Sequence, residues 1–148
     1  MSFFDVSNAP RAGGKLVFLQ GLTPKEWGKV FTFAEMRKFA AGDMLVRAGD
    51  ADDSFYIMTA GSAEVLQGAQ VISQIAEGSV FGEVAFFDRQ ARSASIRALA
   101  AGSAARFSRA AFENLAAWEP VLARRMLYEL GNALAMRLRA AEQRLGSR

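Results

Sequence analysis

The residues best suited to chemistry lie in one short stretch, residues 81–98. Gly82 permits a tight backbone turn and a close approach, and residues 83–87 can form one helical turn. The first N–H groups of such a turn have no partner within the helix, so they attract an anion. Arg92 follows Glu83 by nine residues, at the expected start of the next strand. A loop could fold its guanidinium back over the helical turn, which predicts an anion site.

The carboxylate of Glu83 restricts which anion this site could hold. A carboxylate would repel free phosphate, but it suits a ligand that carries a hydroxyl donor beside its phosphate. A nucleotide ribose with a free 2′-OH meets this requirement, since the carboxylate accepts a hydrogen bond while Arg92 and the N–H groups hold the charge. Ser93 could add a hydroxyl contact. The stretch therefore predicts a nucleotide site.

Short apolar runs separated by turn residues surround this stretch from Glu35 to Arg106. The runs are rich in Val, Ile, Phe and Met, and glycines punctuate them at the spacing of hairpin turns. This pattern is typical of an antiparallel sandwich or barrel. A helix is expected before it, opened by a capping box at Thr23–Glu26 and ending near Phe33.

Helical texture returns after Phe107. Ser108 can cap a helix that ends at Trp118, and Pro120 can open a second helix that ends near Leu145. Trp27 and Trp118 are expected in the core or packed between elements. On the second helix, leucines and a methionine recur at i,i+4 and are expected to face the core: Leu122, Met126, Leu130, Leu134 and Leu138. A heptad-like run offers an alternative, a homodimer seam: Leu134, Leu138, Ala141 and Leu145.

The composition excludes several classes of chemistry. The 148 residues include no His and no Cys, which removes Ser-His-Asp and Cys-His catalysis, Cys-type zinc sites and haem held by His. We therefore expect no enzyme activity, no catalytic residues and no bound metal. The net charge is +3, and the arginines of the C-terminal helix read as a solvated face. With neither an apolar leader nor an apolar run long enough to cross a bilayer, we expect a cytoplasmic protein that binds no nucleic acid and no membrane.

The cassette FGEVAFF, followed by RSASIRA, resembles the phosphate-binding cassette of the cyclic nucleotide-binding domain family. That family includes bacterial catabolite activators, cyclic-nucleotide-gated channels and kinase regulatory subunits. The resemblance extends over roughly residues 16–145 and includes the opening strands at 39–66. It implies a mainly β fold, an antiparallel β-roll with a short N-terminal helix, a cassette helix and two C-terminal helices. A flexible arm (1–14) would precede one domain (15–148), with the β-roll at about 35–108 and the C-terminal helices at about 109–145.

The resemblance also implies roles for the residues of the cassette. Glu83 would accept from the ribose 2′-OH, and Arg92 would pair with the cyclic phosphate. Backbone N–H groups would hold the same phosphate, those of Gly82, Val84 and Ala85. Ser93 would lie against the phosphate or the base. Because Ser93 is neither the Ala common in cyclic AMP binders nor the Thr common in cyclic GMP binders, the ligand stays open between cAMP and cGMP.

The base would occupy a pocket formed by separate elements. Val65 and Phe81 match positions that wall this pocket in members of the family. The long C-terminal helix would be the lid, bringing Arg137, or its neighbours Ala133 and Leu134, near the purine. One departure from the family pattern is Phe86-Phe87, which replaces an aliphatic pair after the cassette's Ala85.

The function expected is a cyclic nucleotide sensor without a further cofactor, which transmits ligand binding through its C-terminal helix to an unidentified protein effector. Three alternatives remain open at this stage. The chain could be the ligand-binding part of a truncated catabolite-activator-type transcription factor, the regulatory part of a channel or transporter, or a dimerisation module without a ligand.

Overall fold

The structure is a computed structural model that describes residues 18–146. The arm expected at residues 1–14 lies outside the described residues. Four helices and eight strands are described, in the order α1 (Pro24–Thr32), β1 (Glu35–Phe39), β2 (Met44–Val46), β3 (Phe55–Ala60), β4 (Ala63–Gln67), β5 (Gln70–Ile75), β6 (Val80–Phe81), α2 (Glu83–Asp88), β7 (Ser95–Ala98), β8 (Gly102–Phe107), α3 (Arg109–Trp118) and α4 (Pro120–Gly146).

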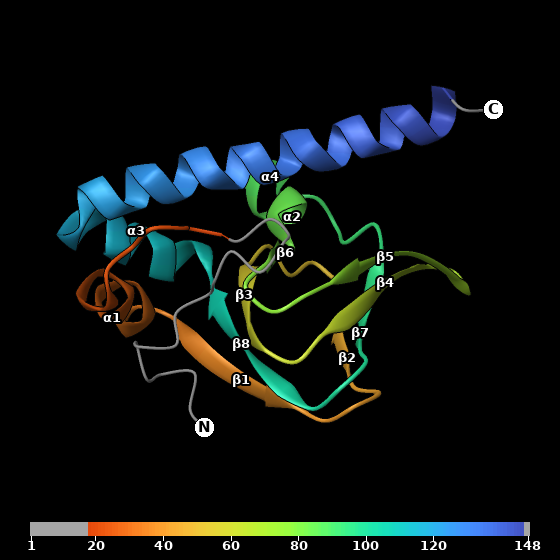
Figure 1. The fold of residues 1–148 in the computed structure, drawn as a ribbon, viewed down its shortest axis with the longest axis horizontal. Helices are drawn as coiled ribbons and strands as arrows, with labels where there is room; N and C mark the ends of the chain where they lie inside the picture. The colour runs from red at the N-terminus through yellow and green to blue at the C-terminus, as the bar shows by residue number, and fades with distance from the viewer. Residues whose placement is uncertain (1–17, 147–148) are drawn as a thin grey trace.

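The strands form two antiparallel four-stranded sheets (Figure 1). One sheet has the order β1-β8-β3-β6, and the other has the order β2-β7-β4-β5. Consecutive strands alternate between the sheets at several points, so the chain rolls one sheet over the other. This is the β-roll expected from the sequence, and α2 follows its last short strand before β7 returns to the second sheet.

Strand β3 lies between two hydrophobic cores because alternate residues of a strand point to opposite faces. Phe55 and Ile57 belong to a core shared with the helices. Tyr56 and Met58 belong to a second core that lies between the two sheets. Both faces of β3 are therefore covered, which explains why its first five residues are all buried.

Helices α1, α3 and α4 pack on the outer face of the first sheet (Figure 1). The expected capping box of α1 is present, since Thr23 Oγ1 accepts from Glu26 N at 3.1 Å and Glu26 Oε1 accepts from Thr23 N at 2.9 Å. Trp27 is 1% exposed in this core. The expectation for Trp118 is wrong: at the α3–α4 corner its side chain is 76% exposed.

The apolar stripe of α4 differs from the expected one. Its buried residues advance by threes and fours, through Leu122, Ala123, Met126, Leu130 and Ala133. Residues at strict i,i+4 spacing drift by about 40° at each step, so Leu138 lies about 160° around the helix from Leu122. Leu138 is accordingly 63% exposed, and Leu134 is only partly buried. The core face of α4 instead continues toward Arg137 and the cassette.

Candidate functional site

The cassette begins where β6 ends at Phe81. Gly82 has φ +80° and serves as the N-cap of α2. This left-handed conformation favours glycine, and space also requires it: a Cβ on Gly82 would lie 2.9 Å from Arg92 Nη1 and 3.1 Å from the Ser54 carbonyl oxygen. The predicted turn is therefore present, and it presses the backbone directly against the side chain of Arg92.

Arg92 lies in the loop between α2 and β7, not at the start of a strand as the sequence predicted. Its backbone N–H donates to the Asp50 carbonyl at 2.8 Å and its carbonyl accepts from Gly49 N at 2.8 Å, so it pairs with the β2–β3 turn. Its side chain is 4% exposed. The guanidinium nevertheless lies over the start of α2, as expected, because Nη1 donates to the Gly82 carbonyl at 2.7 Å.

Further contacts fix the plane of this guanidinium. Nη2 donates to the Ser54 carbonyl at 2.6 Å and to Asp52 Oδ2 at 3.0 Å. Nε is buried and has no hydrogen-bond partner. An arginine has five N–H donors, and only three hydrogen bonds are made here. Arg92 is thus held rigidly while part of its donor capacity stays unused.

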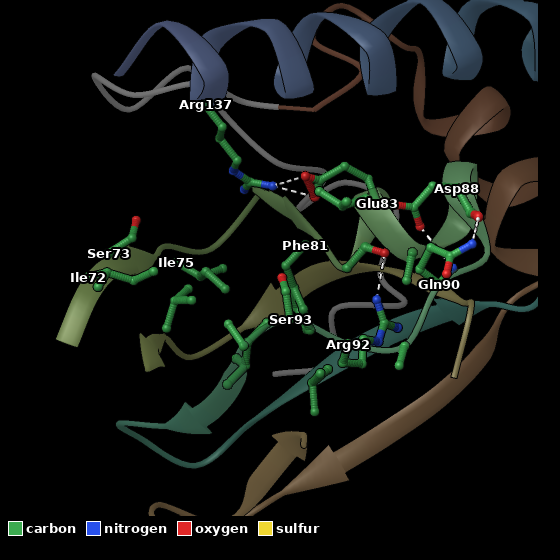
Figure 2. A pocket seen from close by; sticks show the side chains of 18 of the residues that line it. Ile72, Ser73, Ile75, Phe81, Glu83, Asp88, Gln90, Arg92, Ser93 and Arg137 are labelled. Carbon is green, nitrogen blue, oxygen red and sulfur yellow. Dashed lines mark hydrogen bonds and ion pairs between the residues drawn. The ribbon is translucent and has the colours of Figure 1, made fainter. Parts of the chain in front are cut away.

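Glu83, the first residue of α2, is 1% exposed. The Nη1 group of Arg137 donates to both of its carboxylate oxygens. The Nη2 group of Arg137 donates to the Val80 carbonyl at 2.6 Å. Figure 2 shows the arginine descending from α4 to the cassette. The Glu83 carboxylate therefore has a cationic partner, Arg137, that lies 54 positions later in the chain.

A cavity of about 390 Å³ opens beside these groups (Figure 2). Its lining includes the whole cassette set predicted from the sequence, namely Gly82, Glu83, Val84, Ala85, Arg92 and Ser93. Val65 and Phe81, predicted to wall a base, line it as well. A ligand of nucleotide size fits this volume, since small-molecule pockets measure about 300–1,000 Å³.

Helix α4 covers the cavity with residues other than those expected as neighbours of Arg137. Arg137, Ala140 and Arg144 line the cavity, whereas Ala133 and Leu134 do not. Ala133 is 1% exposed in the core beneath the helix, one turn before Arg137. The face that covers the cavity therefore begins at Arg137 and extends toward the end of α4.

Asp52 is a functional candidate that the sequence analysis did not identify. Besides Arg92, it accepts from the Tyr56 hydroxyl at 2.8 Å and from Ser54 N at 3.1 Å, and Arg106 Nη2 lies 3.5 Å from its Oδ1. Partial burial alone raises the pKa of Asp52, but the hydrogen bonds from Arg92, Tyr56 and Ser54 outweigh it and hold the pKa well below the usual value. Asp52 precedes Arg92 by 40 positions, and no local sequence pattern predicts such a pair.

Two other kinds of site are not found in the part of the chain that the structure describes. Residues 18–146 hold no cluster of three or more acidic, His or Cys side chains able to bind a metal ion. Nor does any helix in this range have the length and apolar character needed to cross a membrane.

Comparison with known proteins agrees with the fold and the cassette. The family model for the cyclic nucleotide-binding domain matches residues 36–117. A cAMP-dependent protein kinase regulatory subunit of Hypocrea atroviridis is 34% identical over 110 residues, which are 74% of this chain and 24% of that protein. The chain thus spans about a quarter of the length of this relative.

Solved structures show the same fold. A cyclic nucleotide-binding domain from Methylobacillus flagellatus superposes with a TM-score of 0.76 at 23% identity, covering 96% of this chain and 79% of that one. The structure of Sp-2Cl-cAMPS bound to PKAR CBD2 superposes with a TM-score of 0.59 at 26% identity, covering 80% and 83%. Since the family model spans more than half of its residues and the kinase regulatory subunit is similar over three quarters of it, this chain belongs to the cyclic nucleotide-binding domain family.

Proposed function

We propose that this chain is a non-catalytic sensor domain that binds a cyclic nucleotide, cAMP in preference to cGMP, in the cavity beside α2. The preference for cAMP rests on the relatives, since the similar regulatory subunit belongs to a cAMP-dependent kinase. The absence of His and Cys from all 148 residues supports a binding role over a catalytic one.

The observation that carries this proposal is the state of Arg92. A guanidinium that is 4% exposed, lines a cavity and leaves its buried Nε without a partner is suited to a charged acceptor. An unsatisfied buried donor costs about 1–3 kcal/mol, which a phosphate oxygen would offset. The N–H groups at the start of α2, on Gly82, Val84 and Ala85, would hold the same phosphate, with Ser93 at its edge.

The remaining roles follow from the family resemblance and from the cavity lining. Glu83 would accept from the ribose 2′-OH, because a carboxylate has enough acceptor sites to keep Arg137 as well. Val65 and Phe81 would contact the base. Arg137 would join base and cassette to α4, whose position would then report whether the cavity is filled. One sensor domain would extend over residues 15–148.

Titration calorimetry tests the binding directly. Protein unfolded and refolded to remove carried-over nucleotide is titrated with cAMP and then with cGMP. We expect saturable one-to-one binding that Arg92→Lys weakens about 100-fold, since an ammonium cannot reproduce the bidentate fork. Arg97→Lys is the matched control, because Arg97 pairs with Glu64 on β4 and does not line the cavity. A folded, stripped protein that binds neither nucleotide would refute the proposal.

We further propose that two copies associate through the outward face of α4. Apolar residues follow heptad spacing on that face, with Leu127, Leu138 and Leu145 exposed by 40%, 63% and 64%. Exposed leucines at this spacing form the seam of a two-helix coiled coil. A dimer would place both cavities beside one seam, so a protein effector could contact the α4 helices of both copies at once.

A further inference from the structure

A second hollow lies beside strands β1 and β2 of the β-roll. Strand β1 is one edge of the first sheet, and strand β2 is one edge of the second. A cavity of about 340 Å³ is lined by residues of both strands, and we name it the seam groove. Its apolar lining includes Leu45, Tyr56 and Phe81. A hollow of this size lies within the range of small-molecule pockets, about 300–1,000 Å³.

The charged residues of the seam groove are mostly basic. Arg37, Lys38 and Arg47 line it, against one carboxylate, Asp43. The Asp43 carboxylate accepts a hydrogen bond from Ala40 N at 2.9 Å within its own turn. The cations thus outnumber the carboxylate among the described residues that line the groove.

Two of these cations have no partner of their own. Among residues 18–146, no hydrogen bond or ion pair engages the side chain of Lys38 or that of Arg47. Arg37 pairs with Glu35 at 3.0 Å on the surface, where both side chains are about half exposed. Exposed pairs of this kind contribute little to stability, so Arg37 can exchange its partner at small cost.

We propose that the seam groove binds a small organic anion, a carboxylate carried on an apolar body. The carboxylate would lie between Arg47 and Arg37, which lies on the Phe39 face of β1, since guanidinium groups bind carboxylates through paired N–H donors. The body would cover the partly exposed Leu45, removing apolar surface from water. An anion without a body would leave Leu45 partly exposed, and a body without a charge would leave Arg47 unpaired.

The seam groove also touches the groups that hold Arg92. Phe81 lines both this groove and the cavity beside α2. Its ring stacks on Tyr56 with centroids 4.9 Å apart and planes 4° apart. The Tyr56 hydroxyl donates to Asp52 at 2.8 Å, and the same Asp52 oxygen accepts from Arg92 at 3.0 Å. Two hydrogen bonds therefore separate the wall of the groove from the guanidinium of Arg92.

This connection predicts negative coupling between the two cavities, a part of the inference that rests on the proposed function. An added carboxylate would attract Arg106, which lines the adjoining hollow and lies 3.5 Å from Asp52. Asp52 would then pair more strongly with Arg92 and compete with the ligand phosphate. By linkage, bound nucleotide would lower the affinity for the anion by the same factor.

Hexanoate is the probe, followed by amide chemical shifts in ¹H–¹⁵N spectra of the full chain. We expect saturable shifts confined to residues 37–47 and their strand neighbours, with a Kd of about 1 mM for a ligand this small. Arg47→Gln should weaken binding about 5-fold or more, while Lys25→Gln, on the exposed face of α1, should not change it. Hexan-1-ol and inorganic phosphate, which supply the body and the charge alone, should both bind more weakly.

Three outcomes would overturn the site. The first is a set of chemical shifts that does not saturate at hexanoate concentrations about tenfold above the expected Kd. The second is hexan-1-ol binding as tightly as hexanoate, and the third is hexanoate binding to Arg47→Gln as tightly as to wild type. This experiment needs no nucleotide, so its result is independent of whether the chain binds cAMP.

The coupling is measured separately, as the Kd of cAMP with and without saturating hexanoate. We expect cAMP to bind about 3-fold or more weakly with the groove filled, and Arg106→Gln to abolish that difference by removing the cation that Asp52 would lose. An unchanged Kd in the wild-type chain would overturn the connection between the cavities. Absence of cAMP binding in both conditions would refute the proposed function instead.

Discussion

Arg137 of α4 holds the carboxylate of Glu83 at the start of α2 through both carboxylate oxygens. The same guanidinium donates to the Val80 carbonyl at 2.6 Å, so one side chain fixes the lid helix to both ends of the cassette turn. Beyond Ala133, α4 has no buried residue among those described. The ion pair is therefore a polar contact that keeps this part of the helix over the cavity.

Replacing Arg137 with Ala should loosen this part of α4 and destabilise the fold. The Glu83 carboxylate, which is 1% exposed, would lose its cationic partner, at a cost of about 1–3 kcal/mol. Amide hydrogen exchange should become faster in residues 134–146 than in the α3 helix. Urea unfolding and exchange rates measure the two effects, with Arg139→Ala, a neighbouring exposed arginine, as the control.

A double-mutant cycle separates the ion pair from other effects of the Arg137 change. Glu83→Gln combined with Arg137→Ala should show a coupling free energy of about 1–3 kcal/mol, because either single change already removes the pair. Additive single effects would mean that Arg137 stabilises α4 through its aliphatic stem and not through Glu83.

The sequence was most informative where the interactions are local. The capping box at Thr23 and Glu26 and the turn at Gly82 each depend on residues a few positions apart, and all are present in the structure. The apolar runs separated by glycines likewise predicted an antiparallel sandwich or barrel, and the family resemblance specified the β-roll. These features follow from backbone geometry that any chain with the same local pattern would adopt.

Contacts between distant residues were not predictable in the same way. Asp52 was not identified from the sequence, yet its carboxylate accepts from Arg92, which the fold brings beside it. Arg137 was expected near a base, and its partner is Glu83, 54 positions earlier. The burial of α4 was overestimated beyond Ala133, because i,i+4 spacing does not follow a helix of 3.6 residues per turn.

Glu83 should discriminate ligands by their ribose hydroxyl. In the wild-type chain, 2′-deoxy-cAMP should bind about 10- to 100-fold more weakly than cAMP, since a hydrogen bond to a charged group is worth about 1.5–3 kcal/mol. In Glu83→Gln, both ligands should bind with similar affinity. Calorimetry with the two nucleotides gives the four constants, and a preference for cAMP that persists in Glu83→Gln would assign the 2′-OH to another group.

Asp52 should make the stability of the fold sensitive to acid. The hydrogen bonds from Arg92, Tyr56 and Ser54 hold the pKa of Asp52 below its unfolded value, despite the opposing effect of burial. Its ionised form therefore stabilises the fold above the unfolded pKa of about 4, and this contribution is lost as the pH falls toward the folded pKa.

Asp52→Asn tests this assignment. The variant should be less stable than wild type by roughly 1–3 kcal/mol at pH 7, and the difference should shrink as the pH is lowered below about 4. Urea unfolding at a series of pH values provides the curves. Asp50→Asn, in the same loop, is the control. A gap for Asp52→Asn that is independent of pH would assign its effect to packing.

The proposed dimer depends on the outward face of α4. Leu138→Glu should convert the dimer to a monomer, because two like charges would face each other across the seam, while the fold stays intact since Leu138 is 63% exposed. Sedimentation equilibrium measures the mass, and Leu99→Glu, an exposed leucine on the β-roll, is the control. A wild-type chain that is monomeric at high concentration would contradict the dimer before any variant is made.

Gly82→Ala should harm both stability and nucleotide binding, and Gly42→Ala separates the two causes. Both glycines have a similar positive φ, +80° and +89°, so each substitution to alanine introduces about 1 kcal/mol of backbone strain. Only Gly82 has neighbours within 3.2 Å of the added methyl group, the Arg92 guanidinium and the Ser54 carbonyl. Gly42 has none within 4 Å.

We therefore expect Gly82→Ala to cost about 1–3 kcal/mol more than Gly42→Ala in urea unfolding. It should also weaken cAMP binding about 10-fold or more, because the added methyl group displaces Arg92. Equal losses of stability for the two variants would mean that Arg92 can move away freely, and its fixed orientation would then contribute nothing to the site.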